Sequence, residues 1–181
     1  MPLTLEPLTN GQDPFTLIMD ALEAKIGDTD LSFYKYLDSL GTPLKNIYTQ
    51  REPGGSKNGW DPPRSKCPAV VLLASAFPPA EDRGIGDERW YFAVTILFKM
   101  SLKNQNATPA FQASYELIRT LMAGWRTPQL DPLGSVPGVC TYEIDGNVTP
   151  HISDEESGRS VAKMAFDIRF QFNKNILGGG V

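Results

Sequence analysis

The stretch Arg89-Trp-Tyr-Phe-Ala-Val-Thr-Ile-Leu-Phe-Lys-Met-Ser101 decides the fold of this chain. In a strand, successive side chains point to opposite faces. One face would then carry only apolar side chains, namely Trp90, Phe92, Val94, Ile96, Phe98 and Met100. Alternation of this kind predicts a long strand with one side buried in a core.

A helix is predicted directly after this strand. Thr108-Pro109 joins a good N-cap residue to a proline, which is tolerated at the first helical position. Apolar residues then recur at spacings of three and four, which places them on one stripe: Phe111, Tyr115, Ile118, Leu121 or Met122, and Trp125. We expect this stripe to lie across the apolar face of the strand.

Two further strands are predicted on either side of this unit. The apolar run 69–77, bounded by prolines, is typical of a strand buried on both faces. The polar link 80–88 joins it to the Arg89 strand, so the two should pair antiparallel. Residues 160–172 alternate again, with Ala162, Met164, Phe166, Ile168, Phe170 and Phe172 on one side. That strand far exceeds the usual five or six residues, so it should project beyond the domain.

Shorter elements complete the domain. Asp13-Pro14 opens a helix whose stripe runs from Phe15 to Ile26 and ends at Gly27. Residues 31–40 fit either a second short helix or a packed loop. Short strands are expected at 47–49 and 139–144, the second ending in a turn at 145–147.

The expected fold is therefore α+β. Its mixed, mainly antiparallel sheet has four to five strands, with an N-terminal helix and one helix packed across the sheet. The chain has 181 residues and is 41% hydrophobic, enough for one core, so we expect a single domain over 13–173. Residues 1–12 read as an extended arm and 174–181 as a flexible glycine-rich tail.

Charge and hydropathy exclude some classes of function. The net charge of -4 argues against a general nucleic-acid binder, which relies on many cationic phosphate contacts. No window approaches the ~20 apolar residues of a membrane span. We therefore expect a soluble protein with no membrane partner.

The segment 51–68 is rich in Gly, Pro, Ser and charge, and such long structureless connections are often functional. Its cations are Arg51, Lys57, Arg64 and Lys66, and Trp60 lies among them. Two interpretations remain open. Either this is a solvated loop with Trp60 folded back on the core, or it is a contact arm anchored by Trp60 that meets an acidic surface.

Acidic residues Asp154, Glu155 and Glu156 fall in a Ser/Gly loop. They lack the spacing of a calcium loop, so a solvated acidic run is the preferred interpretation. The one histidine, His151, stands in a Pro-His-Ile-Ser loop without a nucleophile context. Cys67 and Cys140 have neither CxxC nor His neighbours and are expected as reduced, buried thiols.

These residues predict no catalytic, cofactor or metal site, and no enzyme. Gly84-Ile-Gly86 lacks the third glycine and the helix of a dinucleotide site. The aromatic strands at 90–100 and 162–172 are interpreted as core.

In element order, the chain resembles the tail terminator (tail-completion) family of long-tailed phages. The resemblance covers about residues 13–173. It rests on Pro68-Ala-Val-Val opening a buried strand, the Trp90–Met100 strand leading into the helix from Phe111, and the Ala162–Phe172 strand. Segments 51–67 and 145–159 are longer than so small a fold requires.

The resemblance implies a structural virion protein in the tail or neck, made in the host cytoplasm. Its copies would form a ring, expected to be hexameric, that ends the tail tube. Its partners would be the tail tube protein and a head-tail connector or stopper, while DNA passes through without specific binding. The basic and acidic segments, with opposite charges, are the candidate contacts: Arg51, Lys57, Trp60, Arg64, Lys66, Asp154, Glu155 and Glu156.

Two alternatives stay open. Another phage neck, tail-tube or baseplate protein would also lack a catalytic site. A small ligand-binding or enzymatic α+β domain from outside phages would need a polar cluster in a pocket, which the sequence alone does not reveal.

Overall fold

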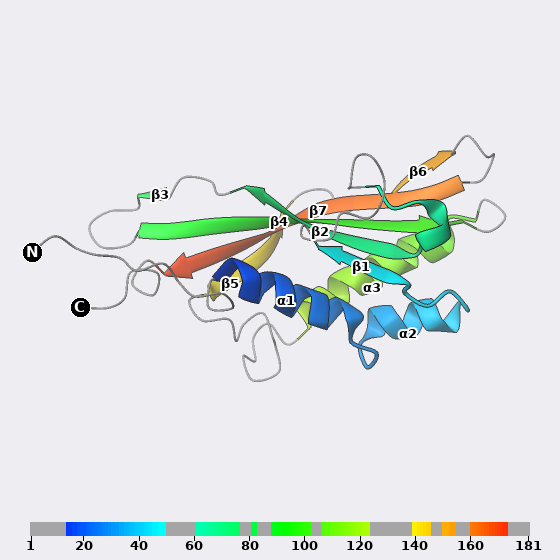
Figure 1. Ribbon diagram of the computed structural model, residues 1–181, viewed down its shortest axis with the longest axis horizontal. Helices are drawn as coiled ribbons and strands as arrows, with labels where there is room; N and C mark the ends of the chain where they lie inside the picture. The colour runs from blue at the N-terminus through cyan, green and yellow to red at the C-terminus, as the bar shows by residue number, and fades with distance from the viewer. Residues whose placement is uncertain are drawn as a thin grey trace, which may run out of the picture.

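The computed structural model describes residues 14–49, 61–76, 81–82, 88–102, 106–123, 139–145, 150–154 and 160–173. Within these ranges a mixed sheet carries three α-helices on one face (Figure 1). The predicted α+β class is confirmed, including the N-terminal helix and the helix that packs on the sheet. The predicted arm 1–12 and tail 174–181 lie outside the described residues.

The sheet follows the path β1-β2-β4-β7-β5, with two short strands off this path. β1 runs parallel to β2, and the other described pairings are antiparallel. The strands are β1 Asn46–Thr49, β2 Ala69–Ala76, β3 Glu81–Asp82, β4 Glu88–Ser101, β5 Val139–Asp145, β6 His151–Asp154 and β7 Ser160–Asn173.

The central pair, β4 and β7, forms the longest ladder of the sheet. Both strands have 14 residues, and their register continues from Arg89 opposite Asn173 to Ser101 opposite Val161. The predicted alternation is confirmed, since the described side chains of the apolar faces from Phe92 to Met100 and from Ala162 to Phe170 are buried. The end of the ladder that carries β3 extends beyond α1 (Figure 1).

Strand β6 is a correction to the sequence analysis, which placed His151 and Asp154 in loops. These residues pair with β7 over Ser160 to Lys163, whereas β5 pairs with β7 only from Asp167 onward. A strand as long as β7 presents unpaired backbone groups wherever its neighbour stops, and a second short strand satisfies them. The segment 151–154 is too short for its alternation to predict strand β6.

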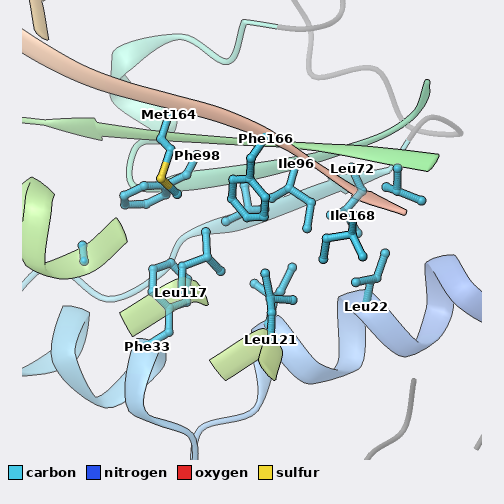
Figure 2. Packing of buried hydrophobic residues seen from close by; sticks show 14 of the residues in the cluster. Leu22, Phe33, Leu72, Ile96, Phe98, Leu117, Leu121, Met164, Phe166 and Ile168 are labelled. Carbon is cyan, nitrogen blue, oxygen red and sulfur yellow. The ribbon is translucent and has the colours of Figure 1, made fainter. Parts of the chain in front are cut away.

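Three helices cover the apolar face: α1 Pro14–Gly27, α2 Ser32–Ser39 and α3 Thr108–Met122. Figure 2 shows side chains of the sheet, such as Ile96 and Phe166, pointing toward Leu121 and Leu22 from the helices. The rings of Phe33 in α2 and Phe98 in β4 meet edge to face, with centroids 5.4 Å apart. Sheet and helices therefore share one core.

The first helix matches its predicted stripe. Ile18, Met19, Leu22 and Ile26 are buried, and Phe15 packs its ring against Phe92 at 5.2 Å. The ambiguous segment 31–40 is resolved as α2, which buries Phe33 and Leu37. The helix layer thus contains α2 in addition to the two helices that the sequence predicts.

The predicted buried stripe of α3 is wrong at Phe111 and Tyr115 and confirmed at Leu121, which is fully buried. Phe111 is 47% exposed and Tyr115 is 61% exposed. The buried face is instead formed by Ala110, Ala113, Ser114, Glu116, Leu117, Thr120 and Leu121. These residues share the same spacing of three and four, but several are small or polar and were not counted as apolar. Small side chains let α3 approach the sheet and α2 closely.

The predicted N-cap of α3 is also wrong. Ala107 is the N-cap residue and makes no side-chain cap hydrogen bond. The carboxamide oxygen of Asn106 accepts a hydrogen bond from the Thr108 backbone N–H at 3.1 Å. Asn106 therefore supplies the local side-chain acceptor that was expected from Thr108.

Polar side chains buried in the helix layer join its elements. Thr120 Oγ1 accepts a hydrogen bond from the Phe33 N–H at 3.0 Å, so a side chain of α3 caps α2. Lys25 is 2% exposed and donates from Nζ to the Ala123 carbonyl at 2.8 Å, just past the end of α3. A cation at a helix C-terminus is favoured by the helix dipole.

Candidate functional site

Three side chains anchor the beginning of the described part of the basic segment, residues 61–66, to the open face of the sheet. Lys99 of β4 lies 3.0 Å from one carboxylate oxygen of Asp61, and Lys163 of β7 lies 2.8 Å from the other. Lys99 Nζ also donates to the Pro62 carbonyl at 3.1 Å. The Lys99 side chain is only 3% exposed, so the Asp61 carboxylate and the Pro62 carbonyl solvate its ammonium group in place of water.

The electrostatics of Asp61 follow from these contacts. Partial burial raises the pKa of the carboxyl, but hydrogen bonds from Lys163 and Lys99, together with their charges, outweigh burial and lower the pKa below its ordinary value. Asp61 is therefore ionised near neutral pH, and one carboxylate serves two cations that face each other across β4 and β7.

Arg64 and Lys66, two of the predicted contact residues, lie on the short 3-10 helix Arg64–Lys66. Arg64 is half-buried and donates from Nε to Ser101 Oγ at 3.2 Å, while Lys66 is exposed. The Lys66 carbonyl accepts a hydrogen bond from Asn46 Nδ2 at 3.1 Å. This helix is thereby tied to both β1 and the end of β4.

Asp154 is the last residue of β6 and pairs with Ser160. The Ser160 carbonyl accepts a hydrogen bond from the Leu102 N–H at 2.9 Å, just beyond the end of β4. The 61–66 segment and the first of the predicted acidic residues thus reach the same end of the sheet. The remaining predicted contact residues lie outside the described ones: Arg51, Lys57, Trp60, Glu155 and Glu156.

The outer side of α3 carries a second candidate contact surface that the sequence analysis missed. Phe111 and Tyr115 are exposed at positions i and i+4, and Ile118, one turn further on, is half-buried. We call these three residues the α3 stripe. The 3.6-residue period identified them as one stripe of the helix but assigned them to the core, because period alone does not distinguish the two sides of a helix.

Metal and nucleophile chemistry finds little support in the parts of the chain that the structure describes. No group of three or more His, Cys, Asp or Glu side chains is close enough there to hold a metal ion. His151 is exposed on β6. Cys67 is a buried thiol, as predicted, and its Sγ donates to the Pro63 carbonyl oxygen at 3.8 Å. The side chain of Cys140 lies outside the described part.

The sequence matches no protein-family model and no curated protein. Among the described residues, no helix is both long and apolar enough to cross a membrane. The candidate surfaces therefore rest on geometry and chemistry alone.

Proposed function

We propose that this chain is a structural subunit of a long-tailed phage, whose copies form a ring that ends the tail tube and joins it to the head. The proposal is supported by the element order on which the family resemblance rests. Apart from α2, the 3-10 helix and the short strands β3 and β6, the observed order is helix, short strand, buried strand, long strand, covering helix, short strand and long strand.

The observation that carries the proposal is the α3 stripe. Exposed aromatic side chains gathered on one face of an element are typical of protein contact surfaces, in which Tyr and Phe are enriched. Tyr115, at 61% exposed, lies on the helix layer, whereas the 61–66 segment contacts the other face of the sheet at Lys99. Two different contact surfaces on separate sides of a subunit are what a head-to-tail ring requires.

The partners in this proposal are further copies of the chain, the tail tube protein and a head-tail connector or stopper. The net charge of -4 suits a ring through which DNA passes without being gripped. The segments around Arg64, Lys66 and Asp154 lie at one end of the sheet. They would therefore act together as one mixed-charge contact surface on the same side of a subunit.

Negative-stain imaging of the purified chain, combined with its mass in solution, tests the proposal. Closed rings of uniform diameter are expected. Open or stacked tubes would favour a tail-tube protein, the first alternative. A monomer at all concentrations would reject the ring and favour the second alternative, a small ligand-binding or enzymatic domain.

A further inference from the structure

A hollow lies at the end of the sheet where β4 leads toward α3. It consists of two adjoining cavities of about 540 and 250 Å³, which share Thr42, Met100, Ser101 and Leu102 in their walls. Volumes of this order are typical of pockets for small ligands. The hollow lies beside the 3-10 helix that carries Arg64, but neither the ring nor the α3 stripe explains it.

One end of the hollow is cationic. Lys45 and Arg64 line the larger cavity together with the hydroxyl-bearing Ser65 and Ser101. Arg64 Nε is bound to Ser101 Oγ at 3.2 Å, which fixes the guanidinium, and no described residue accepts from its terminal nitrogens. Lys45 Nζ makes one long contact with the Ser65 carbonyl at 3.5 Å. No described lining residue is an Asp or Glu.

The other end of the hollow is apolar. The smaller cavity is walled mainly by Leu40, Met100, Leu102 and Pro109, and its polar members are Thr42, Ser101 and Asn106. Met100 and Leu102 are each 5% exposed, so they form a firm wall. The two cavities together thus join a cationic end to an apolar end.

We propose that the hollow binds an amphiphilic anion, a carboxylate or phosphate head group on a short aliphatic body. The head group lies between Lys45 and Arg64, where the planar guanidinium can donate two parallel hydrogen bonds to carboxylate or phosphate oxygens. The aliphatic body lies along Leu40, Leu102 and Pro109. This inference goes beyond the ring and does not depend on it.

The positive charge of the hollow selects the class of ligand. The protein as a whole is acidic, so a hollow that presents two cations and no described carboxylate is a local exception. An anionic head group would gain charge-assisted hydrogen bonds there, whereas a cation would meet repulsion from both side chains. An uncharged apolar ligand would make no charge-assisted hydrogen bond with Lys45 or Arg64.

Calorimetric titration of the full chain with four six-carbon probes tests the proposal. Hexanoate and hexyl phosphate should bind saturably, hexan-1-ol should bind at least about tenfold more weakly, and hexylamine should not bind. Whichever anion binds more tightly identifies the head group. Lack of saturable binding by both anions, or binding of hexylamine as tight as that of hexanoate, would overturn the proposal.

Three variants locate the binding. Lys45→Gln and Arg64→Gln should each weaken the binding of the anions about tenfold, because each removes a charged contact. Lys66→Gln is the matched control, since Lys66 is exposed on the same 3-10 helix but does not line the hollow. Thermal unfolding shows whether Arg64→Gln still folds. If it does not, Lys45→Gln alone tests the proposal, because Lys45 is exposed. Equal affinity of Lys45→Gln and Lys66→Gln for hexanoate would overturn the assignment.

Discussion

The Lys99 side chain is charged but barely accessible to water. How far this burial destabilises the folded protein depends on the contact with Asp61. The side chain of Asp61 is half exposed, while that of Lys99 is 3% exposed. Removing one partner of a buried cation leaves its charge poorly compensated, which costs more than the pair contributes in the intact protein. The contact therefore matters chiefly because it attaches residues 61–66 to the sheet.

Asp61→Asn should lower the free energy of unfolding by about 1–2 kcal/mol at pH 7, measured by urea denaturation. The pKa of Asp61 in the folded protein lies below its unfolded value of about 3.9. The stabilisation is therefore present above that value and is lost as the pH falls through the folded pKa. The difference between the two proteins should stay constant from pH 7 to about 5 and shrink below about 4.

Glu143→Gln is the control for this experiment. Glu143 faces Arg169 at 3.8 Å on the same open face of the sheet, but its side chain is 66% exposed and that of Arg169 is 42% exposed. Its replacement should change the unfolding free energy by less than about 0.5 kcal/mol. Equal losses in the two variants would contradict the special role of Asp61.

At the scale of elements, the helix layer is held together by a cap that no local sequence supplies. Leu31, the N-cap residue of α2, makes no side-chain cap hydrogen bond. The acceptor for the Phe33 N–H comes from Thr120, 87 residues away along the chain. Packing of α3 against α2 and the start of α2 are therefore coupled.

Thr120→Val keeps the shape of the side chain but removes this acceptor. It should lower the free energy of unfolding by about 1–2 kcal/mol, because the Phe33 N–H becomes buried without a partner. Thr120→Ser should retain most of the stability, since it keeps the hydroxyl. Equal denaturation midpoints for the valine variant and the wild type would show that the cap is unimportant.

Substitutions on the two sides of α3 should change the stability of the protein by different amounts. Leu117 is fully buried, so Leu117→Ala should cost about 2–5 kcal/mol of unfolding free energy. Tyr115 is 61% exposed, so Tyr115→Ala should change the stability of the subunit by no more than about 0.5 kcal/mol. Denaturation under conditions that keep the subunits separate provides the comparison. A larger loss of stability in Tyr115→Ala than in Leu117→Ala would instead support the buried stripe that the sequence predicts.

The elements differ in how far the sequence could predict them. Strands β4 and β7 were predictable because alternation continues over 14 residues in each, and a shift by one residue would expose the whole apolar set. The orientation of α3 was not predictable, because two stripes of equal spacing compete on that helix. The packing partner decides between them, and Ala110 and Ala113 fit the close approach better than Phe111 and Tyr115.

The candidate sites show the same division. Composition identified Arg64 and Lys66 as members of a basic segment, but their attachment to the sheet depends on Asp61, Lys99 and Lys163. The hollow combines residues from three separate segments, with Thr42 and Lys45 before β1, Arg64 on the 3-10 helix and Ser101 at the end of β4. No spacing within one segment could reveal a site whose members meet only through folding.

At the scale of the whole molecule, the subunit has two candidate contact surfaces on different layers. One is the α3 stripe, and the other is the end of the sheet where the 3-10 helix with Lys66 and the last residue of β6, Asp154, lie. A contact between unlike surfaces repeats around an axis and closes when the rotation between neighbours divides a full turn. The proposed ring of fixed copy number requires this contact to close.

Native mass spectrometry of the purified chain tests whether it forms this ring. One dominant species is expected at a fixed multiple of the 19.9 kDa chain mass, namely sixfold. Tyr115→Lys, which leaves the core intact, should shift this species to the monomer. A wild-type spectrum of monomer alone or a continuous ladder of sizes would contradict the ring, and a Tyr115→Lys spectrum identical to the wild type would contradict the contact through the α3 stripe.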